Sequence, residues 1–308
     1  MGKTYATPAA FRTALKQAAD KAAKEHGLKN AELMSVFFFG RLAARVFTYD
    51  PHGWLIKGGQ ALLVRYAGSA RLSRDLDLQA TSADLSVEDA LRALVEAAGH
   101  QLDDHLRFAA RPAKLHADPA KGAEQPFDVY LGSTKVHSVK VDVVVGRTVI
   151  GTPEMRTLAP IVGLEWPVEW PPAMLYPVVD HVVDKICAMY EEHPNGPSGR
   201  YRDLADLLLM SQQEVLDGRI THDALRREAD RRTAKGSKVS LPVTFTLPDT
   251  SWNANYPGAA ALVIGLKGCD DIASATPLAR AFMDPLLADG PLQATWNPAA
   301  AVWEPYDG

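Results

Sequence analysis

The chain has 308 residues, 47% of them apolar, which is enough for a full hydrophobic core and excludes a largely disordered protein. Its 33 basic and 37 acidic side chains give a net charge of −4, which excludes a uniformly basic, histone-like binder of nucleic acid. Two cysteines, Cys187 and Cys269, are too few for a disulfide scaffold and wrongly spaced for a zinc site.

Apolar periodicity predicts helices and strands in turn through the first half of the chain. Helical spacing indicates helices over Pro8–Gly27 and Asn30–Thr48. Next come a strand at residues 54–57 and a Gly-Gly turn with a short helix. A strand at residues 74–80 and a capped helix at Ser86–Ala98 follow them. Further strands are expected at Leu106–Ala109, Phe127–Leu131 and Val136–Val145.

The second half of the chain differs from the first in its composition and periodicity. Five prolines and two tryptophans between Gly151 and Pro172 indicate a loop-rich joint. Beyond this joint, helical periods return. They predict helices at Met174–Glu192, Tyr201–Leu216 and Thr221–Ala234, whereas residues 249–308 show no clear period. The sequence therefore predicts an α+β protein with a mixed-sheet core and N-terminal helices in residues 1–150, and a helical lobe with a C-terminal extension in residues 151–308.

The strongest group of chemically active residues combines a glycine pair with three aspartates. Gly58 and Gly59 follow the first strand, and Asp75 and Asp77 are two apart in the next strand, so both carboxylates point to one face. Asp142 is a single carboxylate within a later β-branched strand. If that strand neighbours the first two aspartates, the three side chains can hold divalent cations, and the glycines allow phosphates to approach the backbone.

The segment from Lys57 to Leu78 resembles the first motif of the AbiEii/AbiGii-type nucleotidyltransferases, the MenT-like toxins of bacterial toxin–antitoxin pairs. That motif is a Gly-Gly pair, a short helix and then Arg-x-Ser-x-Asp-Leu-Asp. Here Arg71, Ser73, Asp75 and Asp77 take those places. A later helix with Lys185, followed by Arg-Tyr-Arg-Asp203-Leu-Ala-Asp206-Leu, resembles the later motifs of the family.

The resemblance implies a polymerase-β-like core followed by a helical lobe, and a Mg²⁺-dependent transfer of a nucleoside monophosphate from a nucleoside triphosphate (NTP). It implies Asp75, Asp77, Lys185 and Asp203 as catalytic residues, with Asp75, Asp77 and Asp142 as the metal ligands. The NTP would be bound by Lys57, Gly58, Gly59, Arg71 and Ser73. The implied acceptor is the 3′ end of tRNA, whose extension blocks translation, and a cognate antitoxin protein is the implied partner.

Each of these residues also has an ordinary structural interpretation. Lys57 beside a turn is either solvated or steadies a phosphate, and Arg71 and Ser73 either bind a triphosphate or only cap their loop. Lys185 either extends along an apolar helix face toward water or neutralises charge on the leaving pyrophosphate. Asp203 either serves the helix dipole or orients Lys185 or the acceptor hydroxyl. The motif context favours the functional interpretation for Arg71, Ser73, Lys185 and Asp203.

Two other functions remain open at this point. A nucleotidyltransferase that modifies a small molecule or a protein would keep the carboxylates, and a non-catalytic nucleotide- or RNA-binding protein would not need them. The segment Arg219–Lys238 holds seven basic and three acidic side chains and is the best RNA-facing candidate, although a solvated helix face is its commoner explanation.

We expect a cytoplasmic protein that does not contact a membrane. The N-terminus does not resemble a signal peptide, and no apolar run is long enough to span a bilayer.

Overall fold

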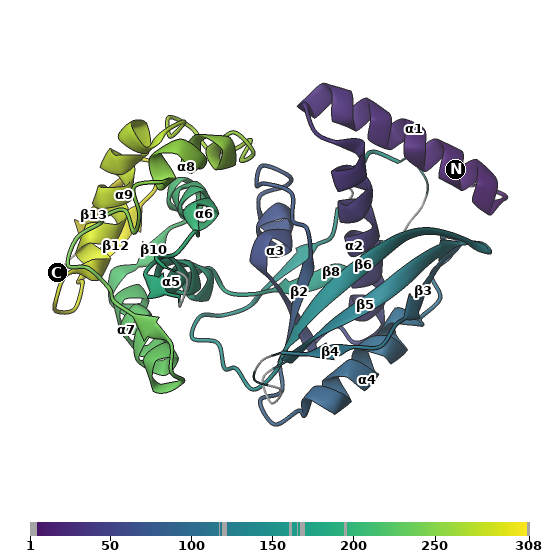
Figure 1. Ribbon diagram of the computed structural model, residues 1–308, viewed down its shortest axis with the longest axis horizontal. Coiled ribbons are helices and arrows are strands. Elements are labelled where there is room, and N and C mark those ends of the chain that lie inside the picture. Colours follow the sequence, from purple (N-terminus) through teal and green to yellow (C-terminus); the bar gives the residue numbers. More distant parts are fainter. Residues whose placement is uncertain are drawn as a thin grey trace. The chain divides into compact units, whose positions relative to one another are not determined.

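The computed structural model describes residues 5–116, 118, 122–159, 162–164, 166, 170–193 and 196–306. The chain forms two compact units (Figure 1). The first comprises Met1–Gly68, Leu72–Thr148 and Pro153–Tyr176, and the second comprises Ser69–Arg71, Val149–Thr152 and Pro177–Gly308. In the part of the chain described, no helix is long and apolar enough to cross a membrane.

A mixed eight-stranded sheet, counted over the described residues, organises the first unit. Its strands follow the order β3-β5-β6-β2-β1-β8-β7, and β4 pairs with β5. The pairs β2–β6 and β1–β8 are parallel, and the other pairs are antiparallel. The strands are β1 (Trp54–Lys57), β2 (Leu76–Ala80), β3 (Leu106–Ala110), β4 (Lys114–Leu115), β5 (Gly122–Leu131), β6 (Thr134–Val144), β7 (Glu154–Thr157) and β8 (Pro172–Leu175).

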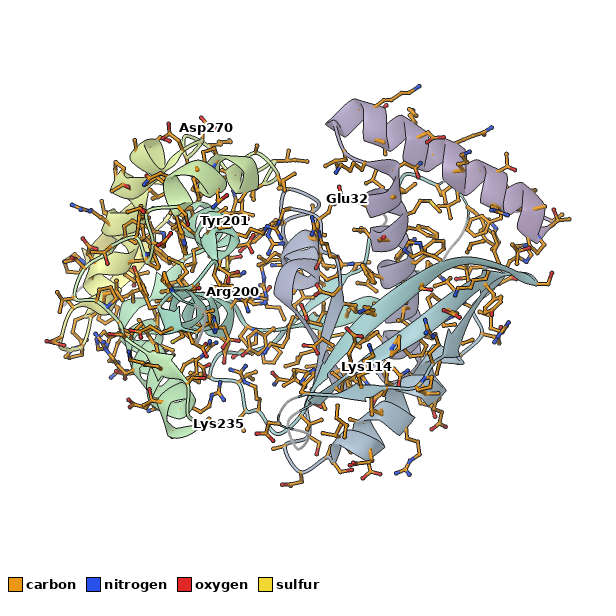
Figure 2. All side chains as sticks on the ribbon, in the orientation of Figure 1. Glu32, Lys114, Arg200, Tyr201, Lys235 and Asp270 are labelled. Atoms are coloured by element: carbon orange, nitrogen blue, oxygen red, sulfur yellow. The ribbon has the colours of Figure 1, made fainter. Side chains whose placement is uncertain are left out.

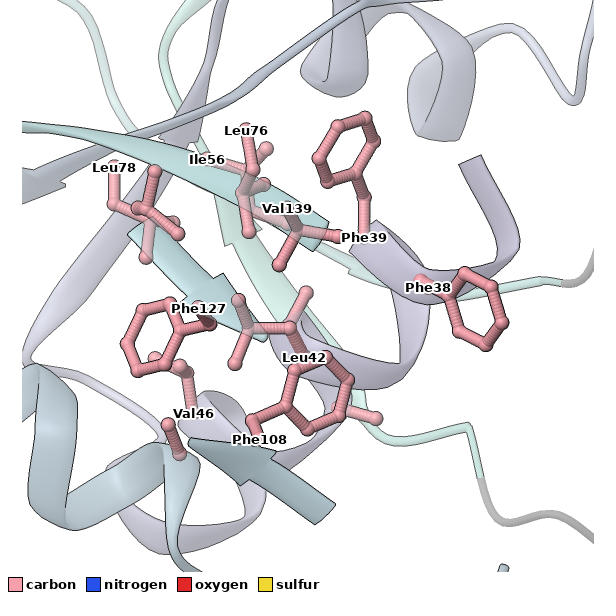
Figure 3. Packing of buried hydrophobic residues seen from close by; sticks show 14 of the residues in the cluster. Phe38, Phe39, Leu42, Val46, Ile56, Leu76, Leu78, Phe108, Phe127 and Val139 are labelled. Carbon is pink, nitrogen blue, oxygen red and sulfur yellow. The ribbon is translucent and has the colours of Figure 1, made fainter. Parts of the chain in front are cut away.

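The helices of this unit are α1 (Pro8–His26), α2 (Asn30–Tyr49), α3 (Gly58–Arg65) and α4 (Val87–Ala98). The Thr7 and Ser86 side chains cap α1 and α4 by accepting hydrogen bonds from backbone N–H groups. Leu42 and Val46 of α2 pack against Leu78 and Phe127 of the sheet in one buried cluster (Figure 3). This apolar face fixes which side of β2 and β6 is buried, and their other side chains must point to the opposite face.

A buried ion cluster ties α2 to the loop before β3. Arg41 donates to Asp104 at 2.8 Å, and Arg45 donates to both carboxylate oxygens of Asp104 at 2.9 and 2.6 Å. All three residues are at most 1% exposed. The guanidinium groups also lie over the rings of Trp170 and Phe108, each 4.9 Å from the centroid. Buried charges persist only when they are paired in this way.

The second unit is mainly helical. Its helices are α5 (Val178–Met189), α6 (Tyr201–Gln213), α7 (Gly218–Ala234), α8 (Trp252–Ala260) and α9 (Ile272–Leu287). Its short strands are β9 (Glu191–Glu192), β10 (Leu216–Asp217), β11 (Lys238–Val239), β12 (Ala294–Asn297) and β13 (Val302–Pro305). They form a three-stranded sheet, β10-β12-β13, and a two-stranded sheet, β11-β9.

These elements confirm the predicted α+β class, with a mixed sheet and helices. The helix predicted from Met174 begins only at Val178, because residues 172–175 instead pair with β1 and β7 as strand β8. Pro177, which the helix interior could not accommodate, stands at its N-cap. The C-terminal segment without a clear period contains α8 and α9, and the fully buried Trp296 of β12.

We expect Asp104→Ala to lower the free energy of unfolding by about 3–5 kcal/mol, because it leaves two buried guanidinium groups without their carboxylate. The matched control is Asp103→Ala, which removes the neighbouring but exposed carboxylate and should change stability by less than about 0.5 kcal/mol. Urea unfolding of both variants checks this. Equal stabilities would show that the Arg41–Asp104–Arg45 cluster contributes nothing.

Candidate active site

One row of charged side chains crosses the sheet of the first unit. The register pairs Lys57 with Asp77 across β1 and β2, Asp77 with Asp142 across β2 and β6, and Asp142 with Glu124 across β6 and β5. Residues that are register partners point to the same face, so these four side chains lie on the face opposite Ile56, Leu78 and Val143. The structure therefore brings two of the predicted aspartates side by side on neighbouring strands.

Asp75 precedes β2 by one residue and is exposed. Two residues separate it from Asp77 along the extended chain, which is the spacing that returns a side chain to the same face. Its Oδ1 atom accepts a hydrogen bond of 3.0 Å from the Ser73 hydroxyl, and Ser73 itself is only 5% exposed. Ser73 thus fixes the orientation of the Asp75 carboxylate.

The glycine pair lies directly against these side chains. Gly58 has φ of +58°, a conformation that favours glycine, and a Cβ atom placed there would overlap the Asp77 carboxylate. A Cβ atom at Gly59 would come within 3.1 Å of the Ser73 side chain. The two glycines therefore form a cradle that any larger side chain would fill, beginning at the N-terminus of α3.

Lys57 ends β1 and is 8% exposed. Its Nζ atom lies 4.0 Å from the centroid of the Tyr176 ring. The aromatic contact and the neighbouring Asp77 hold the ammonium group at the edge of the carboxylate row rather than in open solvent.

His116, which sequence reasoning missed, contacts the third aspartate. Its Nε2 atom lies 2.6 Å from Asp142 Oδ1. Burial raises the pKa of Asp142 above its ordinary value; His116 and Lys57 act against this rise, and the charge of Asp75 adds to it. No motif in the sequence singles out His116, because it is 26 residues from Asp142 and outside both glycine and aspartate motifs.

A second group of predicted residues gathers in the second unit, on α5, α6 and the loop residue Arg71. Lys185 donates to Asp203 and to Asp206, both at 2.7 Å, and Arg71 donates to Asp206 through Nε at 3.1 Å and Nη2 at 2.9 Å. Asp206 is fully buried. Arg200 is labelled at the start of α6 in Figure 2, and its Nη1 atom lies 3.6 Å from Asp203 Oδ2.

These contacts decide the protonation of the second group. Burial alone would lower the pKa of Lys185, but Asp203 and Asp206 outweigh it and hold that pKa above its ordinary value. Burial alone would raise the pKa of Asp206, but Lys185 and Arg71 hold it below its ordinary value. Lys185 and Asp206 thus both stay charged, and Asp206 holds both Lys185 and Arg71 in place.

The predicted site residues therefore fall into two sets. Those of the first unit are Lys57, Gly58, Gly59, Ser73, Asp75, Asp77 and Asp142, and those of the second unit are Arg71, Lys185 and Asp203. Among the described residues, no three acidic, histidine or cysteine side chains converge closely enough to hold a metal ion by themselves. Asp77 and Asp142 nevertheless present carboxylate oxygens, the ligands that hard cations prefer, from adjacent strands.

The basic segment Arg219–Lys238 is largely paired within the second unit. Arg226 donates to the carbonyl groups of Leu287 and Ala288 at 2.6 and 2.7 Å. Arg231 and Arg232 both donate to Glu228, and Lys238 pairs with Glu192. Four of its seven basic side chains thus serve internal contacts, which favours a structural interpretation of this segment.

Comparison with known proteins identifies one matching family. A family model for the nucleotidyl transferase AbiEii toxin of type IV toxin–antitoxin systems matches residues 41–296. Among solved structures, the chain is similar to MenT4, a nucleotidyltransferase toxin from Mycobacterium tuberculosis H37Rv, with 15% identity and a TM-score of 0.50 over 87% of this chain and 97% of that chain. A putative nucleotidyltransferase from H. pylori has 13% identity and a TM-score of 0.43 over 79% of this chain and 93% of that one.

No curated protein matches the chain. The family match confirms the resemblance predicted from the glycine and aspartate motifs. The likeness to MenT4 concerns the fold.

We expect Gly58→Ala to lower the rate of nucleotide transfer from labelled NTPs on the order of a hundredfold. A methyl group there displaces the Asp77 carboxylate, and misplacement of a reacting group by about 1 Å costs on the order of a hundredfold in rate. Gly68→Ala is the matched control, since Gly68 also has a positive φ, +84°, but its Cβ would meet open space. The control should lose about 1–2 kcal/mol of stability from backbone strain and keep its rate. Equal rates of nucleotide transfer in Gly58→Ala and Gly68→Ala would contradict the role given to the glycine cradle.

We expect Asp206→Asn to lower the free energy of unfolding by about 3–5 kcal/mol at pH 7, because Lys185 and Arg71 lose a buried counter-charge. The folded pKa of Asp206 is depressed, so its carboxylate stabilises the fold above the unfolded pKa of roughly 3.9 and loses this effect as the pH falls through the folded pKa.

The difference between wild type and Asp206→Asn should therefore narrow below about pH 4 in urea unfolding experiments. Asp230→Asn, which changes an exposed carboxylate on α7, should stay within about 0.5 kcal/mol of wild type. A difference that is independent of pH would contradict the ionised state of Asp206.

Proposed function

Because the chain belongs to the AbiEii family of nucleotidyltransferase toxins from type IV toxin–antitoxin systems, we propose that it transfers a nucleoside monophosphate from an NTP to the 3′ end of tRNA. Nucleotides added at that end prevent aminoacylation and so block translation. The observation that carries the proposal is the row of Asp77 and Asp142 beside the Gly58–Gly59 cradle, which lies within the residues that match the family.

Magnesium is the metal that suits this row. It is usually held by one or two carboxylates together with water and substrate phosphates, so it does not need a closed cage of protein ligands. In the proposal, Asp75, Asp77 and Asp142 hold Mg²⁺ against the phosphates of the NTP. When bound, the ion supplies positive charge to the phosphates and orients the acceptor oxygen for in-line attack.

The other residues of the first unit would act on the NTP directly. Gly58 and Gly59 leave room for phosphate oxygens to reach the backbone N–H groups at the start of α3. Lys57 adds a positive charge at the edge of the carboxylate row. Ser73 positions the Asp75 carboxylate through its hydrogen bond.

The second unit would supply the cations for the triphosphate. Lys185 stays protonated because two carboxylates contact its ammonium group. Asp206 grips Arg71 through two atoms of the guanidinium group, so the side chain is held in a fixed direction. We propose that Lys185 and Arg71 contact the triphosphate and that Asp203 orients Lys185.

The proposed setting is the cytoplasm, where NTPs and tRNA are both found, with a cognate antitoxin as the partner that counters the activity. Transfer to a small molecule or a protein is the rival function. It is favoured by one observation, since the pairing of Arg226, Arg231, Arg232 and Lys238 removes the segment that best suggested an RNA surface. A non-catalytic nucleotide- or RNA-binding protein is the remaining alternative.

The test uses the purified full chain with Mg²⁺, total tRNA and each of the four α-labelled NTPs in turn. We expect label on tRNA with at least one nucleotide, and none after chelation of the metal. Asp77→Asn should lower the rate by at least about a hundredfold, because metal-ion stabilisation is worth several kcal/mol. Asp128→Asn, which changes a carboxylate on β5 that pairs with Lys135, should keep the wild-type rate.

The acceptor that carries the label separates the alternatives. Label on protein or on an added small acceptor, with none on tRNA, would support the rival transferase. No label on any acceptor, together with an unchanged biological effect of Asp77→Asn, would support the binding protein.

A further inference from the structure

A groove of about 920 Å³ lies in the first unit, far along the β5–β6 hairpin from the carboxylate row. One wall is the beginning of α1, with Arg12, Thr13 and Lys16, and the other is the hairpin tip, with Ser133 and Thr134. Figure 1 shows this tip beside the first turns of α1. Helix α1 ends before residue 41, so the groove is built partly outside the residues that match the family.

Two basic side chains, Arg12 and Lys16, outnumber one acidic side chain, Asp20, among the described residues that line the groove, so the groove is positive overall. Arg12 and Lys16 are one helical turn apart, so two like charges lie on the same side of α1 and repel each other. No described residue forms an ion pair with either of them. The one acidic side chain that lines the groove, Asp20, accepts a hydrogen bond of 2.7 Å from Asn30. An external anion would relieve the repulsion between Arg12 and Lys16.

The two walls are held firmly to the rest of the unit. Phe11 and Leu15, at most 1% exposed, anchor the opposite side of α1, and the Phe11 ring lies 4.8 Å from that of Trp166. A Cβ atom at Gly132 would come within 3.0 Å of Pro8, so the hairpin tip and the first turn of α1 are already in close contact. The positions of Arg12 and Lys16 are therefore fixed relative to the sheet.

The distance from the groove to the carboxylate row determines the size of any ligand that reaches both. Both lie on the β5–β6 hairpin, the row at Glu124 and the groove at Leu131. Seven residues of strand separate them, which corresponds to about 23 Å at about 3.3 Å per residue. Helix α1 packs on the apolar face of the sheet and the row lies on the opposite face, so about 23 Å is the shortest path between them. No NTP or small acceptor spans that distance. A polynucleotide does so with at least about seven stacked nucleotides, at about 3.4 Å each.

We propose that this groove binds the phosphate backbone of the RNA acceptor at least about seven nucleotides from the end that receives the new nucleotide. Arg12 and Lys16 neutralise phosphates, and the hydroxyl groups of Thr13, Ser133 and Thr134 donate hydrogen bonds to phosphate or ribose oxygens. None of the described residues that line the groove is aromatic, so the groove offers no surface on which bases could stack and suits contacts to the RNA backbone. The inference rests on the proposed function and names the part of the protein that holds the RNA acceptor away from the reacting end.

The test compares Arg12→Glu/Lys16→Glu with a control of equal charge change on the same helix, Lys21→Glu/Lys24→Glu, whose residues do not line the groove. Binding and nucleotide transfer are measured with one RNA of three nucleotides and one of about twelve that share the same 3′ end. We expect the groove variant to bind the longer RNA on the order of tenfold more weakly, with a salt slope smaller by roughly 1.4, since each phosphate contact of a single strand contributes about 0.7. The short RNA should behave identically in all three proteins.

Each other outcome has a definite meaning. Equal affinity of the groove variant and the control for the longer RNA, or an equal loss with both lengths, would overturn the proposal. Unchanged RNA binding with loss of neutralisation by the antitoxin would overturn it in favour of an acidic protein segment. If the wild type binds the longer RNA more tightly but transfers no nucleotide, RNA binding by the groove is supported and the proposed function is refuted. Failure of the groove proposal and failure of the proposed function are therefore distinguishable.

Discussion

The parallel pairing of β2 with β6 is the constraint on which the candidate site depends. Leu76, Leu78, Val141 and Val143 must be buried on one face, and this requirement fixes the register between the two strands. Asp77 and Asp142 follow as neighbours on the opposite face. A slip of one residue would bury the carboxylates and expose the leucines. The hydrophobic core and the candidate metal ligands are thus set by the same few backbone hydrogen bonds.

The second unit solves a different physical problem, which is how to stabilise three buried charges and the partly exposed Arg71. Lys185, Asp203, Asp206 and Arg71 are mutually paired, so their burial leaves no net charge. Such a group fixes the orientation of the Lys185 and Arg71 side chains more than it stabilises the fold, because each cation is held by two contacts. A lysine on a flexible stem and an arginine on a loop become fixed donors, which is the property that a phosphate-binding site requires.

Local patterns in the sequence predicted most of the first unit, because its strands alternate and its helices are amphipathic. The bounds of β1 and the starts of α1 and α2 agree with the prediction. The aspartate spacing predicted a shared face for Asp75 and Asp77 and left the place of Asp142 conditional on its strand; the structure pairs Asp142 with Asp77, and the role of these residues as ligands stays a prediction. Features that depend on distant partners were missed: β8 reads as part of a helix until its pairing with β1 is known, and His116 carries no motif. Likewise, Arg226 appears free in the sequence but contacts the carbonyl groups that end α9.

Because the chain is synthesised from its N-terminus, the residues of the carboxylate row emerge at different times. Asp77 leaves the ribosome early, but its neighbour on β6 is residue 142, and β1 gains its partner on the other side only with Leu175. A nascent chain interrupted before β6 contains Lys57, Asp77 and Glu124 but lacks Asp142 and the strand that joins β2 to β5. Any activity that depends on both Asp77 and Asp142 therefore requires a chain in which β6 has already paired with β2.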